Sequence, residues 1–316
     1  MPKHTGLEVK TALASVYDYL IGVDGGGTKT HIRIEQADGT PIAEASSGPS
    51  ALMHGRDKAW AAITIAINQG FHSAGMTPPP LQRMAAGFGL SGVNVPAWAA
   101  EFSALNPGFG SIVVASDAIT TLFGAHQGRP GAIIAIGTGS IGALLRPDQT
   151  QHIIGGWGFP SGDEASGAWL GLLAINYVQQ VFDGRAHNCA LADSIIAHCG
   201  GHAGNGDDKH NRDSVLGWLA QANQSRYAQL APLIIQHAAR DDVARNMLDK
   251  AAGEIVSMAN ALDPSGQLPL ALCGGLGQVL RDFLPKALQQ RTSLPLADSA
   301  TGGLLLIHQH LSQDFS

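Results

Sequence analysis

Residues 19–30 read Tyr19-Leu-Ile-Gly-Val-Asp24-Gly-Gly-Gly-Thr28-Lys29-Thr30. An apolar run typical of a buried strand leads into three glycines, and a second strand-like segment begins at His31. A later stretch, Ala132-Ile-Ile-Ala-Ile136-Gly137-Thr138-Gly139-Ser140, has the same layout. Two such turns predict two similar half-molecules, each offering backbone N–H groups to a phosphate chain. They favour an ATP-dependent enzyme with its site in the cleft between the halves.

The first glycine cluster has the composition of a phosphate-binding turn. Glycines lack Cβ atoms, so backbone N–H groups can approach phosphate oxygens closely. Asp24 at the strand end would hold Mg²⁺ directly or through water. The spacing matches neither a Walker A loop nor a dinucleotide fingerprint, and an ordinary hairpin is the alternative. The candidate ATP-binding residues of this turn are Gly25, Gly26, Gly27, Thr28 and Lys29.

Two further glycine-rich turns extend the nucleotide site. Gly137, Thr138 and Gly139 repeat the hairpin device. The stretch Cys273-Gly274-Gly275-Leu276-Gly277 ends another apolar strand and opens a helix. Glycines there would let a purine or its ribose lie flat against the backbone. A strand–helix turn without a ligand is the alternative for Gly274, Gly275 and Gly277.

Asp117 follows the apolar strand Ser111–Ser116 and precedes a helical segment. A carboxylate at such a junction lies near a helix N-terminus, which stabilises its negative charge. In a phosphotransferase it would be the general base that accepts the proton of an attacking sugar hydroxyl. The alternative is an aspartate that only caps the helix.

The segment Gly155-Gly156-Trp157-Gly158-Phe-Pro-Ser-Gly-Asp163-Glu164-Ala-Ser166 suggests a sugar site. Trp157 offers an apolar plane for a pyranose face, and Asp163 could accept hydrogen bonds from ring hydroxyls. Asp163 could also cap the helix expected to follow, with Glu164 in its first turn. The two roles can coexist.

Composition excludes several classes of protein. The 316 residues are 45% hydrophobic, enough for two domains. The net charge of −6 and the lack of a Lys/Arg run argue against nucleic-acid or membrane partners. The odd number of cysteines, without C-x-x-C spacing, indicates reduced thiols in a cytoplasmic protein. The sequence contains no apolar span of 18 residues, so we expect no transmembrane helix.

The stretch Asn188–Asp213, with His198, His202 and His210, is expected to be a solvated loop rather than a metal site.

The periodicities predict an α/β chain with two halves of βββαβαβ order. Expected strands are Tyr19–Asp24, His31–Gln36, Pro41–Ser46, Arg83–Leu90, Ser111–Ser116, Ala132–Ile136, Ile141–Arg146, His152–Gly155, Leu268–Cys273 and Leu294–Ala297. Expected helices are Arg56–Gly70, a short one near Pro96–Leu105, Asp163–Asp183, a long helical region with an apolar stripe from Val243 to Leu262, Gln278–Gln289 and Thr301–Leu311. We expect domains at residues 1–121, with 1–18 as an extension, and 122–316, the last helix packing back on the first domain.

These motifs together resemble the sugar kinase/actin/Hsp70 superfamily and, within it, the BadF/BadG/BcrA/BcrD-type ATPase family. The resemblance runs from about Tyr19 to Leu311, and the segment 155–167 looks like the N-acetylglucosamine and glucosamine kinases of that family. It implies two ribonuclease-H-like, actin- or hexokinase-like domains around an ATP cleft. It also implies that Asp117 is the base and that Thr28 and Thr138 touch ATP. The sugar would be surrounded by Ser91, Asp117, Ser140, Gly156, Trp157, Gly158 and Asp163.

The sequence departs from the family pattern at one place. After Gly48-Pro49-Ser50 many relatives carry an asparagine that binds sugar hydroxyls, and this chain has Ala51. Asn94 or His54 could supply the missing contact. Because of Ala51, the sequence leaves the identity of the sugar open. The type of reaction is affected much less.

The expected reaction is ATP- and Mg²⁺-dependent phosphorylation of an amino sugar, most simply N-acetylglucosamine to its 6-phosphate, with glucosamine as the alternative substrate. The expected protein is a cytoplasmic homodimer acting on a small molecule. Another class within the same family is the ATPase activator of a 2-hydroxyacyl-CoA dehydratase or benzoyl-CoA reductase. Such an activator needs cysteine ligands for a [4Fe–4S] cluster, and Cys189, Cys199 and Cys273 are poorly placed for it. A non-catalytic sugar sensor is a third possibility, against which the intact Asp117 argues.

Overall fold

The computed structural model describes residues 16–202, 204 and 208–314. Its contacts divide the chain into two compact units. Of the described residues, the first unit contains those at 16–131, 145–149 and 295–314. The second contains those at 132–144 and 150–294. The expected extension 1–18 lies mostly outside the described residues. The domain limit expected after residue 121 falls inside a helix of the first unit.

The first unit is built on a mixed sheet with strand order β3-β2-β1-β4-β5. β1 is antiparallel to β2 and parallel to β4. The described elements of this unit are β1 (Tyr19–Gly25), β2 (Thr30–Gln36), β3 (Pro41–Ser47), η1 (Leu52–His54), α2 (Arg56–Ser73), η2 (Leu81–Arg83), β4 (Met84–Leu90), α3 (Pro96–Ala104), β5 (Ser111–Ala115), α4 (Asp117–His126) and α13 (Ser299–Asp314).

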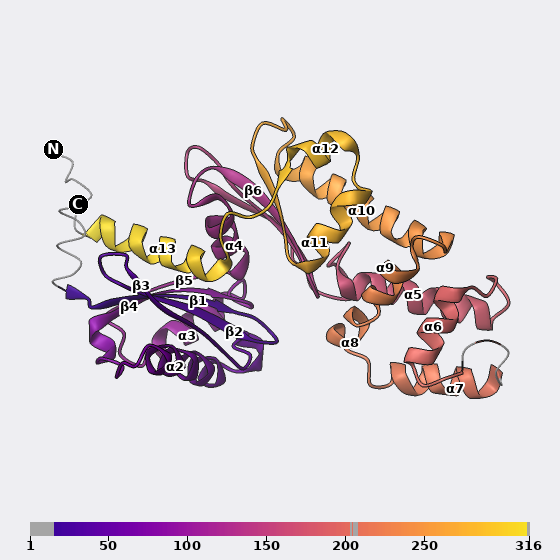
Figure 1. Cartoon of the computed structure of the whole chain (residues 1–316), viewed down its shortest axis with the longest axis horizontal. Helices are drawn as coiled ribbons and strands as arrows, with labels where there is room; N and C mark the ends of the chain where they lie inside the picture. The colour runs from indigo at the N-terminus through magenta and orange to yellow at the C-terminus, as the bar shows by residue number, and fades with distance from the viewer. Residues whose placement is uncertain (1–15, 203, 205–207, 315–316) are drawn as a thin grey trace. The chain divides into compact units, whose positions relative to one another are not determined.

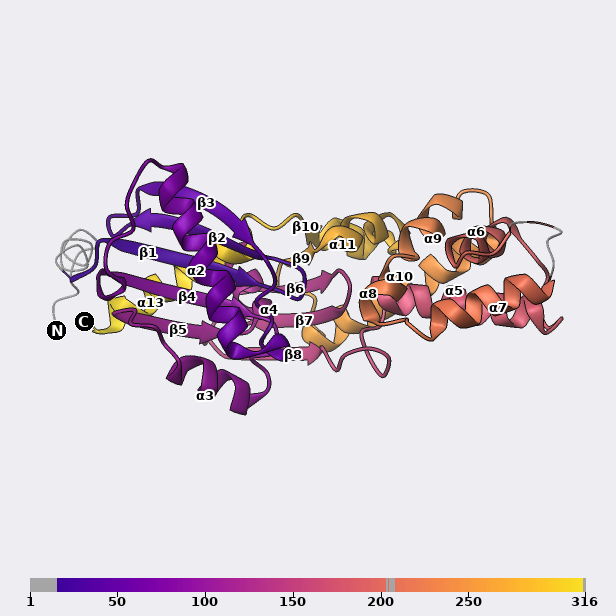
Figure 2. The same ribbon diagram turned by 90° about the horizontal axis from the view of Figure 1, so that it is seen from below.

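Helices cover both faces of this sheet. Figures 1 and 2 show α2 on one face and α13 on the other. α13 approaches the sheet backbone closely, because a Cβ atom at Gly22 would lie 1.9 Å from the Ala300 carbonyl oxygen and one at Gly87 would lie 2.0 Å from that of Gly303. Glycines at these positions therefore bring the start of α13 next to the strand that carries Asp24.

Aromatic side chains build the core between the sheet and α2. Trp60 of α2 stacks on Phe102 with ring centroids 4.2 Å apart and meets Phe88 edge-on. The Trp60 indole N–H donates to the Phe102 carbonyl at 3.0 Å, so the buried ring leaves no unsatisfied donor. This core sets the positions of β4 and of the loop after it.

The second unit repeats the strand order, as β8-β7-β6-β9-β10. β6 is parallel to β9, and β9 to β10. Its described elements are β6 (Gly131–Ile136), β7 (Ser140–Leu145), β8 (Gln151–Gly155), α5 (Gly167–Phe182), α6 (Ala190–His198), α7 (Asp208–Leu219), α8 (Gln224–Ala228), α9 (Ala231–His237), α10 (Asp242–Leu262), β9 (Leu270–Cys273), α11 (Gly275–Leu280), η3 (Arg281–Phe283), α12 (Lys286–Arg291) and β10 (Thr292–Ser293).

The expected α/β class and the repeated strand order are confirmed, whereas several expected elements were wrong. The helix expected at Asp163–Asp183 begins only at Gly167, because Asp163 and Ala165 adopt positive φ. The helix expected at Gln278–Gln289 is interrupted before Pro285, which lacks the N–H that a helix interior needs. Residues 294–297 form no strand, and β10 precedes them. The loop expected at Asn188–Asp213 contains α6 and the start of α7.

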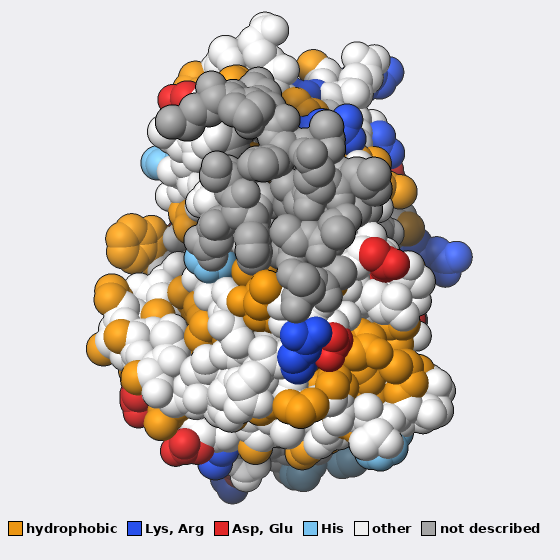
Figure 3. Space-filling model, turned by 90° about the vertical axis from the view of Figure 1, so that its left-hand side faces the viewer, with side chains coloured by type: hydrophobic (Ala, Val, Ile, Leu, Met, Phe, Trp, Pro, Cys, Tyr) orange, Lys and Arg blue, Asp and Glu red, His pale blue; other side chains and the backbone are white. Residues whose placement is uncertain are grey.

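The described surface agrees with the small net charge. On the face drawn in Figure 3, hydrophobic, acidic and basic side chains are interspersed with other side chains and backbone, drawn in white. Among the described residues, no helix is long and apolar enough to cross a membrane.

Candidate functional site

The first glycine-rich turn joins β1 and β2. Gly25 pairs with Thr30, and the Gly26 N–H donates to the Lys29 carbonyl at 3.0 Å. The Ser91 N–H donates to the Gly25 carbonyl at 2.9 Å, and two loop N–H groups, of Ser50 and Ala51, donate to the Gly26 carbonyl at 3.1 Å. Loops after β3 and β4 are thus attached to the carbonyl groups of this turn. The predicted sugar residue Ser91 lies beside the turn for this reason.

The glycines of the three turns differ in whether packing requires the absence of a side chain. A Cβ at Gly25 would lie 2.3 Å from the Ser50 hydroxyl and one at Gly274 2.2 Å from the Ile136 carbonyl oxygen, so packing excludes side chains there. A Cβ at Gly27, Gly137 or Gly275 would meet no described atom within 4 Å, and none of these three has a positive φ. The open space at these three turns fits a ligand that approaches the backbone.

Asp24 is the next-to-last residue of β1, and it is half-buried. Burial raises the pKa of the Asp24 carboxyl, against a hydrogen bond from the Ser299 hydroxyl that lowers it. The positive charge of Lys29 acts in the same direction as Ser299. Asp24 is the acidic group at the edge of the first turn, where a carboxylate oxygen suits Mg²⁺.

Asp117 is the first residue of α4, and its neighbour Ser116 caps the helix. The Ser116 hydroxyl accepts from the Ile119 N–H, so the capping alternative for Asp117 was wrong. One Asp117 carboxylate oxygen accepts from the Ala118 N–H at 2.9 Å. Burial, together with the nearby charge of Asp24, raises the pKa of Asp117 to about 6. A carboxylate with this pKa is suited to accept a proton near neutral pH.

A polar network behind these two carboxylates was missed from the sequence. The Thr120 hydroxyl lies 2.8 Å from the Ser299 hydroxyl and donates to the Asp117 backbone carbonyl at 3.0 Å. Ser299, the first residue of α13, therefore connects the surroundings of Asp24 and Asp117. No local pattern could reveal this contact, because Thr120 and Ser299 are 179 residues apart.

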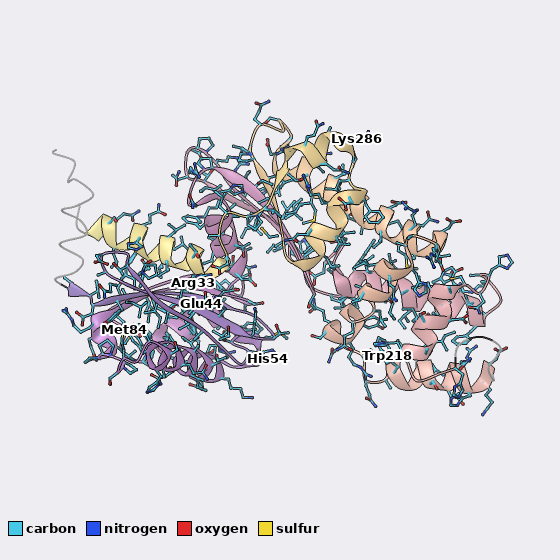
Figure 4. The ribbon with its side chains drawn as sticks, viewed as in Figure 1. Arg33, Glu44, His54, Met84, Trp218 and Lys286 are labelled. Atoms are coloured by element: carbon cyan, nitrogen blue, oxygen red, sulfur yellow. The ribbon has the colours of Figure 1, made fainter. Side chains whose placement is uncertain are left out.

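Asp298, just before α13, forms an ion pair with Arg33 of β2. The Arg33 guanidinium binds it through two nitrogens, at 2.7 Å for the closer pair, and also contacts Glu44 at 2.9 Å (Figure 4). The Thr301 N–H and the Thr301 hydroxyl also donate hydrogen bonds to the Asp298 carboxylate. Burial raises the pKa of Asp298, but the hydrogen bonds from Arg33 and Thr301 outweigh it and lower the pKa to about 2. The start of α13 is thereby anchored to β2 beside Asp24.

The second glycine-rich turn joins β6 and β7 and is held by α5. The Gly137 N–H donates to the Gly139 carbonyl at 2.9 Å. The first N–H groups of α5, from Gly167 and Ala168, donate to the carbonyls of Gly137 and Thr138 at 2.8 and 3.2 Å. The helix N-terminus thus satisfies its unpaired donors on the turn and fixes the turn's orientation.

Asp163 is buried against this turn. Its side chain is 5% exposed, and it accepts hydrogen bonds from the backbone of Ser140 and Gly158 and from the Gln224 side chain. Burial raises the Asp163 pKa, and those donors oppose the rise. The helix that follows is capped by Ser166, whose hydroxyl accepts from the Trp169 N–H at 3.1 Å. Capping by Asp163 was therefore wrong.

The remaining predicted sugar residues lie around Asp163. Gly155, Gly156 and Gly158 all have positive φ, and the ring of Trp157 is 82% exposed. The Ser140 hydroxyl donates to the Glu164 carbonyl at 2.6 Å. Asp163, Ser140 and the 155–158 loop are thus brought together, with the Trp157 ring free to meet a ligand.

Two sequence observations outside these turns also have a structural outcome. Ala51 is 1% exposed and uses its N–H to bind Gly26, so its side chain faces protein. Cys199 and Cys273 are buried, and burial raises their pKa values to about 11 and about 12. Among the described residues no group of three or more His, Cys, Asp or Glu side chains could hold a metal ion.

Comparison with known proteins shows the family of this chain. The family model of the BadF/BadG/BcrA/BcrD ATPase family matches residues 21–292. Glucosamine kinase GspK of Vibrio cholerae is 33% identical over 290 residues, covering 91% of this chain and 95% of that protein. A structure from Chromobacterium violaceum, provisionally assigned as an N-acetylglucosamine kinase, is 45% identical with a TM-score of 0.87 and covers 93% of this chain and 99% of that one.

A more distant likeness concerns the fold alone. A ROK family glucokinase from Streptomyces griseus, solved with glucose and AMPPNP, is 16% identical with a TM-score of 0.51 and covers 92% of this chain and 98% of that one. The family model matches residues of both sheets, and the two kinase relatives overlap the chain almost completely. These matches confirm the resemblance inferred from the glycine-rich turns, and this chain belongs to the BadF/BadG/BcrA/BcrD ATPase family.

Proposed function

We propose that this protein is an ATP-dependent kinase that phosphorylates an amino sugar, with N-acetylglucosamine as the preferred substrate and glucosamine as the alternative. Two relatives named as amino-sugar kinases overlap this chain over almost their whole length, which supports the reaction class. The observation that carries the proposal is Asp117, a partly buried carboxylate with its pKa raised to about 6 that is not needed as a helix cap.

Asp117 would act as the general base. It would accept the proton of the sugar O6 hydroxyl as that oxygen forms a bond to the γ-phosphorus of ATP. The bond from that phosphorus to the bridging oxygen breaks, and ADP leaves with the electron pair. Proton acceptance by a positioned carboxylate contributes about 10²–10⁴ in rate, and the rest comes from positioning and charge stabilisation.

The glycine-rich turns would bind the nucleotide. Backbone N–H groups of the turns at 25–28 and 137–139, with the Thr28 and Thr138 hydroxyls, would face phosphate oxygens, and Lys29 would offset their charge. Gly274, Gly275 and Gly277 would lie against the adenosine. Asp24 would hold Mg²⁺, which neutralises charge on the phosphates. The open space at Gly27, Gly137 and Gly275 supports these assignments.

The sugar would lie against the Trp157 ring, near Asp163, Ser140, Gly156 and Gly158. Ser91 is a further proposed sugar contact. Asp163 would accept a hydrogen bond from a ring hydroxyl. The 2-amino or 2-acetamido group distinguishes the two candidate substrates. The side chain of Ala51 is buried and has no polar atom. Asn94 or His54 would supply the remaining hydroxyl contact.

The activator function is less supported. A [4Fe–4S] cluster needs accessible thiolates. Cys199 and Cys273 are buried, so their thiols are not presented at the surface to a cluster shared between two subunits. Iron content in the purified protein would revive this alternative.

A coupled assay of ADP release with Mg-ATP tests the proposal. The panel contains N-acetylglucosamine, glucosamine, N-acetylmannosamine, glucose and no sugar. We expect release that depends on sugar and is greatest with N-acetylglucosamine. Equal release with and without sugar would contradict a kinase. The homodimer and the cytoplasmic location stay predictions, the former testable by mass measurement in solution.

A further inference from the structure

We propose that Gln224 is a positioning residue that fixes the Asp163 carboxylate against the Gly137–Ser140 turn. Gln224 is the first residue of α8 and lies 61 positions from Asp163 in the sequence. Its side-chain Nε2 donates to Asp163 Oδ2 at 2.7 Å. For its effect on catalysis this inference rests on the proposed function, in which Asp163 contacts the sugar.

The hydrogen bonds that Asp163 already accepts limit how many acceptor sites its carboxylate has for a ligand. The carboxylate receives donors from the Ser140 and Gly158 backbone and from Gln224. A carboxylate offers about four lone-pair sites, so these three donors leave about one for a sugar hydroxyl. Two of the donors belong to the second turn and the Trp157 loop. Gln224 is the side chain that sets the remaining direction of the carboxylate.

Close packing explains why Gln224 is held in place. A Cβ at Gly171 of α5 would lie 2.0 Å from the Tyr227 carbonyl oxygen, so α8 packs directly on the α5 backbone. The Tyr227 ring also contacts Phe159 of the 158–166 loop, with centroids 5.0 Å apart. Gln224 therefore projects from a short helix that is fixed both to α5 and to the loop that carries Asp163.

The Gly137–Ser140 turn packs directly against the side chains of Asp163 and Gln224. A Cβ at Gly139 would lie 2.8 Å from Asp163 Oδ2 and 3.2 Å from Gln224 Nε2. The carboxylate and the amide thus occupy the space that a side chain on the turn would need. Moving either one would change the support of the turn and of the hydrogen bond that Ser140 gives to Asp163.

Two variants with opposite steric and electrostatic effects separate positioning from packing. Gln224→Ala removes the donor and leaves a space, whereas Gln224→Glu fills the space but sets a second carboxylate against Asp163. If Gln224 positions Asp163, the sugar KM should rise about 10-fold in Gln224→Ala and more in Gln224→Glu, since a hydrogen bond to a charged group is lost. The KM for ATP should change less than the KM for the sugar, because the N–H groups of Gly167 and Ala168 still hold the carbonyls of the turn. Gln229→Ala, an exposed glutamine at the end of α8, is the matched control.

Amide hydrogen exchange of the ligand-free protein gives a readout that does not depend on activity. We expect faster exchange at the Ser140 and Gly158 amides in both Gln224 variants, and no change in Gln229→Ala. Unchanged exchange, or a Gln224→Glu variant milder than Gln224→Ala, would overturn the inference. A wild type without sugar-dependent ADP release would instead overturn the proposed function, and the exchange rates would still decide the role of Gln224.

Discussion

The two units have the same strand order and a glycine-rich turn after their first strand, yet they surround their key aspartates differently. Asp117 receives the Ala118 N–H and lies in the field of Asp24. Asp163 receives two backbone donors and an amide side chain. Burial raises the pKa of both carboxyls, and backbone N–H donors oppose the rise at both. The charge of Asp24 adds to the rise at Asp117, whereas the Gln224 amide adds a further opposing donor at Asp163. Under the proposed function, the same residue type would take a proton in one unit and accept hydrogen bonds from the sugar in the other.

Replacing the proposed base should have the largest effect. Asp117→Asn keeps the size of the side chain but cannot accept a proton, so kcat should fall by about 10²–10⁴. The KM for ATP should be little changed. Steady-state kinetics on N-acetylglucosamine measure this, with circular dichroism as the check on folding. Turnover equal to wild type would remove Asp117 from the mechanism and erase the contrast between the two aspartates.

The same substitution should stabilise the protein. The folded pKa of Asp117, about 6, lies above its unfolded value of 3.8, so ionisation costs stability at pH above 6 and costs nothing below about 4. Asp117→Asn should therefore raise the free energy of unfolding at pH 8 by up to about 3 kcal/mol. The gain should disappear as the pH falls from 6 to 4. Urea unfolding across that range measures it, and a gain that is constant with pH would contradict the raised pKa.

Activity should show the same titration in the wild type. Since the ionised form of Asp117 is the base, kcat/KM should fall about tenfold per pH unit below about pH 6. The fall follows the folded-state pKa. A pH profile measured at saturating Mg-ATP tests this, and an acid limb near pH 4 would assign the base an ordinary carboxyl pKa.

Asp163→Asn should act on substrate binding more than on turnover. The amide keeps one acceptor oxygen, but its NH₂ group faces donors from Gly158, Ser140 or Gln224. Losing hydrogen bonds to a charged group should raise the sugar KM about 10- to 100-fold. Sugar and ATP titrations measured side by side give the result. A larger loss of kcat than of sugar affinity would make the two aspartates alike in role.

Removing the serine caps should have the smallest effect. Ser116→Ala and Ser166→Ala should each lower the free energy of unfolding by about 1 kcal/mol. Both substitutions leave the neighbouring aspartate in place, so the pH profile of activity should keep its position. Thermal unfolding and the same pH profile give both readouts. Stability unchanged in both variants would return the capping role to Asp117 and Asp163.

Local patterns in the sequence predicted the turns and strand–helix junctions on which the candidate site residues lie. Glycines after apolar strands marked all three turns, and an aspartate after a strand marked Asp117. The start of α5 was predicted four residues early, because Asp163 and Ala165 adopt positive φ that no pattern announces. Ser299 and Gln224 escaped notice because their partners are far away in the sequence. Serine at a helix start and glutamine on a short helix are otherwise unremarkable.

The placement of α13 has a consequence for how the chain is made. The first unit receives this helix only after residues 132–294 have been synthesised, apart from the short return at 145–149. Until then the glycine-lined faces of β1 and β4 lack the helix that packs on them, and Asp24 lacks Ser299. The first half to leave the ribosome would therefore be the last to mature, with an apolar sheet face open to chaperones in the interval.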